Sequence, residues 1–244
     1  GVDESIQDMV NRLHREGYVA AAPDFYHRQS PDEDPAKRSG LLRDNEMLAD
    51  IEAAITRVKG LNIPISRFGV VGFCLGGRAS FLAASVINEF KASAVFYGGN
   101  MTVARGDSPV PFDRLSGIQC PLIGFFGADD TNPSPADVAK VSAELTRLGK
   151  WHEFHSYRDT GHAFHNFSEK DRYRERAARG SWHEMLAFFL FAVAAAVTPG
   201  PSNLLVMAAG ARAGLAGGLR CLAGVVVGMG LLIGVAAFGL AGVL

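Results

Sequence analysis

Short apolar runs alternate with amphipathic stretches along the first 184 residues of the chain. The short runs are bounded by glycine, proline or charged residues and predict buried strands over residues 18–22, 67–73, 92–97, 121–127 and 152–157. Apolar residues at helical spacing predict helices over residues 5–16, 41–59, 76–88 and 135–148, and from about residue 168. This alternation predicts an α/β fold, with a mostly parallel sheet that helices cover on both faces.

The pattern changes at Met185. All 25 acidic residues precede this position, and the only charged residues after it are Arg212 and Arg220. Two uncharged runs, over residues 185–211 and 221–244, each exceed the about 20 residues that span a bilayer. We therefore expect two domains, an α/β domain over 1–184 and two hydrophobic transmembrane-like helices over 185–244.

Charge and cysteine content narrow the class of protein. The net charge of −1 does not indicate a nucleic-acid partner. The three cysteines, Cys74, Cys120 and Cys221, are too few and too scattered for a disulfide framework. This usage is typical of a reducing compartment, so we expect the α/β domain to be cytoplasmic, and membrane-associated if residues 185–244 are genuine.

The stretch GFCLGGR, residues 72–78, follows a predicted strand and fits the G-x-nucleophile-x-G turn, with Cys74 where serine is usual. Gly72 and Gly76 suit a tight turn in which a side chain would meet the neighbouring strand or helix. The backbone N–H of Leu75 can donate to an oxyanion, and the helix that follows favours a thiolate at its N-terminus. The alternative is a buried structural cysteine in a glycine-rich turn.

Possible partners for Cys74 follow two later strands. Asp129 and Asp130 come after the predicted strand 121–127, and His162 comes after the predicted strand 152–157. The order of nucleophile, acid and histidine is that of α/β-hydrolases, and all three loops leave the carboxyl edge of the sheet. The two aspartates could instead cap the turn before Pro133. A metal site is not expected, because the nearby histidines have no matching cysteine or acidic ligands.

Five motifs, in order, resemble one family. They are GYVAAAPDFYHRQ, GVVGFCLGGR, AVFYGG, LIGFFGADDTNPSP and HEFHSYRDTGHAFHNF, and through them residues 1 to about 190 resemble the dienelactone hydrolase family. The resemblance implies a Cys-Asp-His triad with Cys74 as nucleophile, Asp130 as acid and His162 as base. It further implies hydrolysis of an enol-lactone or ester through an acyl-cysteine intermediate, without a cofactor.

The same resemblance assigns Arg28 to the substrate carboxylate, the alternative being a surface arginine, and it places Tyr97 at the pocket. Asn166 stands where the family's type enzyme carries a second carboxylate-binding arginine, so a general carboxylesterase is an alternative. The family also has strands before the first predicted helix, and their loop carries a glutamate that readies the cysteine and part of the oxyanion hole. Since this sequence begins at Gly1, after that loop, we expect little activity from it.

Residues 185–244, with TPGP at 198–201, resemble the N-terminal part of lysine-exporter-type translocators. Positively charged loops are usually cytoplasmic, so Arg212 and Arg220 would place the short loop between the two predicted spans in the cytoplasm and residues 1–184 outside the cell. That conflict favours an accidental joining of two segments over a hydrolase tethered to the membrane through 185–244. Two alternatives are an exporter fragment with an inactive hydrolase-like passenger and a non-catalytic α/β binding module.

Overall fold

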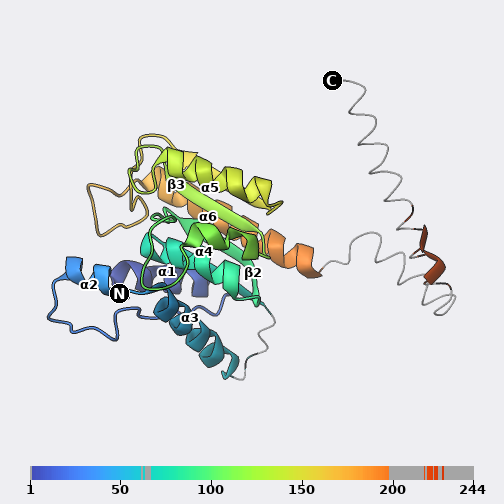
Figure 1. The fold of residues 1–244 in the computed structure, drawn as a ribbon, viewed down its shortest axis with the longest axis horizontal. Coiled ribbons are helices and arrows are strands. Elements are labelled where there is room, and N and C mark those ends of the chain that lie inside the picture. Colours follow the sequence, from blue (N-terminus) through green and yellow to red (C-terminus); the bar gives the residue numbers. More distant parts are fainter. Residues whose placement is uncertain are drawn as a thin grey trace. The chain divides into compact units, whose positions relative to one another are not determined.

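Four parallel strands form the sheet of the protein, in a computed structural model that describes residues 2–61, 63, 67–197, 217, 219–221, 223–224 and 227. They pair in chain order as β1 (Phe68–Phe73), β2 (Phe90–Phe96), β3 (Leu122–Gly127) and β4 (His152–Tyr157). Figure 1 labels β2 and β3, with helices around them. All three pairings are parallel, which confirms the predicted sheet. Every residue of β3 is buried, as expected for a continuous apolar run inside a parallel sheet.

Helices cover both faces of this sheet. They are α1 (Glu4–Arg15), α2 (Pro35–Leu41), α3 (Asp44–Lys59), α4 (Leu75–Val86), α5 (Pro135–Arg147) and α6 (Glu175–Val197), with a 3₁₀ helix η1 (Pro111–Gly117). One core cluster joins α3, α4, η1 and α5 to the sheet and includes Ile51, Phe81 and Leu145. A second cluster joins α1 and α6 to the sheet and includes Met9 and Phe188. The two clusters agree with the predicted arrangement, in which helices cover both faces of the sheet.

The carboxyl ends of the strands meet at one edge. Hydrogen bonds continue the strand pairing past their ends, because the N–H of Cys74 donates to Phe96 O at 3.0 Å and the N–H of Ala128 donates to Tyr157 O at 2.8 Å. The turns after β1, β3 and β4 therefore all leave the same edge of the sheet, with β2 between β1 and β3, and this arrangement allows residues distant in sequence to form one site.

Three predicted elements differ in the structure. Residues 18–22, which are described throughout, form no strand; Tyr18 and Ala20 instead pack against the cluster of α1 and α6. An apolar run predicts burial, but here Tyr18, Ala20 and Ala22 are only half-buried, and Val19 and Ala21 are exposed. The helix α2 has no counterpart among the predicted helices. The last helix begins at Glu175 rather than near residue 168, because turns occupy the intervening residues.

The α/β part of the chain extends beyond the predicted boundary. The chain divides into two compact units, Gly1–Ala192 and Val193–Leu244, and the predicted boundary at residue 184 falls inside α6. Met185, Phe188 and Phe189 are buried in the core, so the start of the first predicted membrane span belongs to the α/β unit. Residues 198–211 of the first predicted span, and all of the second except residues 221, 223, 224 and 227, lie outside the described residues. Within the described part, no helix is both long and apolar enough to cross a membrane.

Candidate active site

Cys74 occupies a sharp turn between β1 and α4. Its backbone has φ 54° and ψ −116°, a region that non-glycine residues rarely occupy and that is costly without surrounding support. Close packing explains the glycines around it: a Cβ on Gly72 would lie 1.9 Å from Gly76 O, and a Cβ on Gly77 would lie 2.7 Å from Phe96 O. A Cβ on Gly76 would meet nothing within 4 Å, so the predicted steric need for glycine at that position is wrong.

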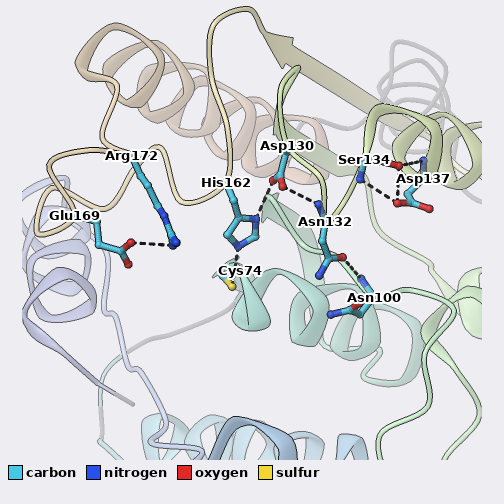
Figure 2. Close-up of polar contacts among 9 residues, drawn as sticks. All are labelled: Cys74, Asn100, Asp130, Asn132, Ser134, Asp137, His162, Glu169 and Arg172. Carbon is cyan, nitrogen blue, oxygen red and sulfur yellow. Dashed lines mark hydrogen bonds and ion pairs between the residues drawn. The ribbon is translucent and has the colours of Figure 1, made fainter. Parts of the chain in front are cut away.

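The structure brings Cys74, Asp130 and His162 together (Figure 2). The Nε2 atom of His162 lies 3.0 Å from Cys74 Sγ, and its Nδ1 atom lies 2.8 Å from Asp130 Oδ2. Because a carboxylate only accepts, Nδ1 donates to Asp130, and Nε2 is directed at the sulfur. Of the two candidate acids, Asp130 is 4% exposed and bonds to His162, whereas Asp129 is exposed and uses its backbone N–H to bond Thr160 O.

The pKa of the Cys74 thiol is lowered. The side chain is exposed, yet the protein around the sulfur desolvates it and thereby opposes ionisation. The hydrogen bond and positive charge of His162, together with the Leu75 backbone N–H that donates to the sulfur, outweigh this opposition. In this geometry the Leu75 N–H, predicted as an oxyanion donor, stabilises the thiolate.

The pKa of His162 changes in the complementary direction. Desolvation favours the neutral imidazole, but hydrogen bonds to Asp130 and Cys74 and their negative charges raise its pKa to about 10. A lowered thiol pKa and a raised imidazole pKa both favour a thiolate paired with an imidazolium. That is the protonation state in which a cysteine is most nucleophilic and a histidine is ready to donate a proton.

Aromatic rings support the imidazole of His162. Tyr97 is 2% exposed and its ring packs edge-on against His162, with centroids 5.1 Å apart. The predicted pocket residue thus contacts the histidine directly. His165 is also buried, among Phe73, Phe96 and Trp182, and burial lowers its pKa to about 4, so that it stays neutral. Within the described part of the chain, no group of three or more metal-binding side chains comes together.

The predicted carboxylate-binding residue, Arg28, is exposed, but its guanidinium is paired with Asp50. Its Nη1 and Nη2 atoms each lie 2.7 Å from an oxygen of Asp50, and His27 Nε2 lies 3.1 Å from the same carboxylate. Any substrate carboxylate would compete with Asp50 for this guanidinium. At the position of the second family arginine, Asn166 donates from its side chain to Glu169 Oε1 at 3.3 Å.

Sequence reasoning missed Asn132. Its backbone N–H donates to Asp130 Oδ1 at 2.8 Å, and its side-chain Oδ1 accepts from the N–H of Asn100 at 3.1 Å (Figure 2). An aspartate that accepts from the N–H two residues on forms an Asx turn, and the following Pro133 is a turn signal visible in the sequence. The contact with Asn100 crosses between two loops and has no local signature.

The order of nucleophile, acid and histidine along the carboxyl edge of a parallel sheet defines the class of α/β-hydrolases. The model of the dienelactone hydrolase family matches residues 1–192, and the chain belongs to this family. It is accordingly a hydrolase of that family.

Individual relatives agree with the family. The "Putative carboxymethylenebutenolidase" of Salmonella typhimurium is 32% identical over 197 residues, which cover 78% of this chain and 73% of the relative. A Synechocystis protein of the same name is 33% identical over 201 residues, 78% of this chain and 81% of that protein. The crystal structure of a "Putative Dienelactone Hydrolase" from Klebsiella pneumoniae has a TM-score of 0.71 at 30% identity, covering 78% of this chain and 82% of that one.

Proposed function

We propose that this chain hydrolyses a lactone or carboxylic ester with Cys74 as nucleophile, His162 as base and acid, and Asp130 as the residue that orients His162. The observation that carries the proposal is the position of His162, with Nε2 at 3.0 Å from Cys74 Sγ and Nδ1 at 2.8 Å from Asp130. A nucleophile, a base within hydrogen-bond reach and a third group that orients the base make up the arrangement required for acyl transfer.

The reaction has two steps. The Cys74 thiolate attacks the carbonyl carbon, the C–O bond to the leaving group breaks, and the imidazolium of His162 gives its Nε2 proton to the departing oxygen. This step leaves an acyl-cysteine and a neutral imidazole. A water molecule then attacks the acyl carbon while His162 takes its proton, which releases the carboxylic acid and restores the thiolate and imidazolium pair. Asp130 holds the ring in place throughout.

A lactone with a stabilised leaving group suits this chemistry. A thiolate of low pKa is itself a good leaving group, so the tetrahedral intermediate collapses forward most readily when the oxygen that departs is also a good leaving group, such as an enolate. The relatives named carboxymethylenebutenolidase support a lactone. The pairing of Arg28 with Asp50 and the presence of Asn166 leave a general carboxylic ester as the second substrate class within the same mechanism.

Trapping the acyl-cysteine tests the proposal. The whole chain is mixed with p-nitrophenyl acetate, quenched in acid and digested, and peptides are analysed by mass spectrometry. We expect an acetyl group on the peptide that contains Cys74, slow ester turnover, and loss of both in Cys74→Ala. Turnover that persists at the wild-type rate in Cys74→Ala would contradict the proposal.

The resemblance of residues 185–244 to an exporter stays a prediction.

A further inference from the structure

A closed ring of polar contacts joins the residues of the candidate active site to the loop after β2. On one side, His162 joins Cys74 and Asp130 at 3.0 and 2.8 Å. On the other side, the Asp130 carboxylate accepts from the N–H of Asn132, and the Asn132 side chain accepts from the N–H of Asn100. Figure 2 shows this row of side chains from Cys74 to Asn100. The loop after β3 that carries Asp130 and Asn132, called the acid loop here, is thus hydrogen-bonded to the loop after β2.

Arg78 completes the ring of contacts by joining Asn100 to Cys74. It lies on α4, where its backbone N–H donates to Cys74 O at 3.1 Å, and its Nη1 donates to Asn100 O. Its guanidinium is also paired with the buried carboxylate of Asp44 and donates to Val103 O at 2.7 Å. The loop that receives the Asn132 contact is therefore anchored to the helix that begins at the nucleophile.

The contact between Asn132 and Asn100 fits closely. A Cβ on Gly99 would lie 2.4 Å from Asn132 Oδ1, so the carboxamide occupies the space that glycine leaves. Asn100 has φ 54°, a left-handed conformation that asparagine tolerates, and its N–H is satisfied by the carboxamide. Gly99 thus leaves room for the Asn132 carboxamide, and Asn100 adopts the backbone conformation that directs its N–H toward it.

The orientation of Asp130 depends on the place of residue 132. One carboxylate oxygen receives the Asn132 N–H and the other receives His162 Nδ1, so movement of the Asn132 backbone would turn the carboxylate away from the imidazole. Small displacements of a supporting group cost catalysis because the reacting groups leave their productive geometry.

We propose that Asn132 is a positioning residue, which through its side chain holds the acid loop against the loop anchored by Arg78 and so keeps Asp130 directed at His162. The inference rests on the proposed function of Cys74, Asp130 and His162. Asn132 acts through Asp130, and it is not assigned a contact with the substrate.

Alkylation of Cys74 by iodoacetamide tests this role without needing a substrate. In Asn132→Ala we expect the pH midpoint of alkylation to rise by about one unit, so that the rate at a pH below the wild-type midpoint falls about tenfold. The value of kcat for p-nitrophenyl acetate should fall while KM is unchanged. Asn132→Asp keeps an oxygen that can accept from Asn100 and should restore the rate. Gly99→Ala, which displaces the carboxamide sterically, should slow alkylation as Asn132→Ala does.

Asn88→Ala is the matched control, because Asn88 is exposed near the other end of α4, and it should react as the wild type does. Far-ultraviolet circular dichroism checks that each variant is folded. A wild-type pH midpoint in Asn132→Ala would overturn the proposal. So would equally slow alkylation of folded Asn132→Asp, because the acceptor oxygen would then not be the cause. If instead wild-type Cys74 reacts no faster than an ordinary thiol, and His162→Gln changes nothing, the proposed function itself fails.

Discussion

The guanidinium of Arg78 holds the carboxylate of Asp44 in a buried ion pair, with Nε 3.0 Å from Oδ1 and Nη2 2.6 Å from Oδ2. Their side chains are 1% and 0% exposed. Asp44 begins α3 and Arg78 lies in the first turns of α4, so the pair joins two helices on one face of the sheet. The ion pair thereby holds α4, the helix that follows Cys74, against α3.

Removing one partner of this pair should be costly. We expect Arg78→Met to lower the free energy of unfolding by about 3–5 kcal/mol, because the Asp44 carboxylate is left buried without a counter-charge. The double variant Arg78→Met with Asp44→Leu should recover much of that loss, since no charge then remains to be solvated. Urea denaturation measures both. A single variant as stable as the wild type would show that the pair contributes nothing to stability.

The pH dependence of Cys74 reactivity follows from the two shifted pKa values. His162 lowers the pKa of the thiol, so the thiolate persists as the pH falls below the ordinary thiol range and is lost only at the lowered pKa. The imidazolium persists until the pH rises through about 10. Ester hydrolysis should therefore follow a bell-shaped profile between these limits, measured as kcat/KM against pH.

An internal reference makes the alkylation profile decisive. Burial raises the pKa of Cys120 to about 11, so this cysteine should react slowly at pH 7 in the same sample. His162→Gln should move the midpoint of Cys74 alkylation upward, toward an ordinary thiol, because the imidazolium is gone. Equal rates for Cys74 and Cys120, read by mass spectrometry of the two peptides, would contradict the thiolate and imidazolium pair.

The two adjacent aspartates allow a matched test of the acid. We expect Asp130→Asn to lower kcat by as much as about 10⁴-fold, the loss seen when the orienting carboxylate of a serine triad is replaced by an amide. Asp129→Asn should retain wild-type kcat, because Asp129 is exposed and its bond to Thr160 uses only the backbone. The reverse order of effects would assign the role to Asp129.

The two glycines that flank Cys74 should respond differently to alanine. Gly72→Ala should abolish ester turnover and destabilise the fold, since the new Cβ would lie 1.9 Å from Gly76 O. Gly76→Ala should leave the fold intact and raise its stability by about 0.5–1 kcal/mol, because its Cβ meets nothing and alanine suits a helix better than glycine. Thermal unfolding of the two variants measures the difference, and equal destabilisation would count against the described packing.

Much of the fold was accessible from local pattern. The strand of residues 152–157 and the starts of the helices at Glu4 and Pro135 agree closely with the expectations, because apolar periodicity and capping residues act over a few neighbours. The prediction of a strand at residues 18–22 is wrong, because a short apolar run is a local pattern, whereas pairing depends on whether another strand lies alongside.

The candidate site shows the same division. The sequence by itself determined that a cysteine turn, an acid and a histidine follow successive strands, since the order of residues and the carboxyl edge of a parallel sheet suffice for that. Only the tertiary structure decided that Asp130 rather than Asp129 meets His162, that Arg28 is paired with Asp50, and that Asn132 ties two loops together. These contacts join residues 22 or more positions apart, and their formation depends on side-chain geometry that no local pattern encodes.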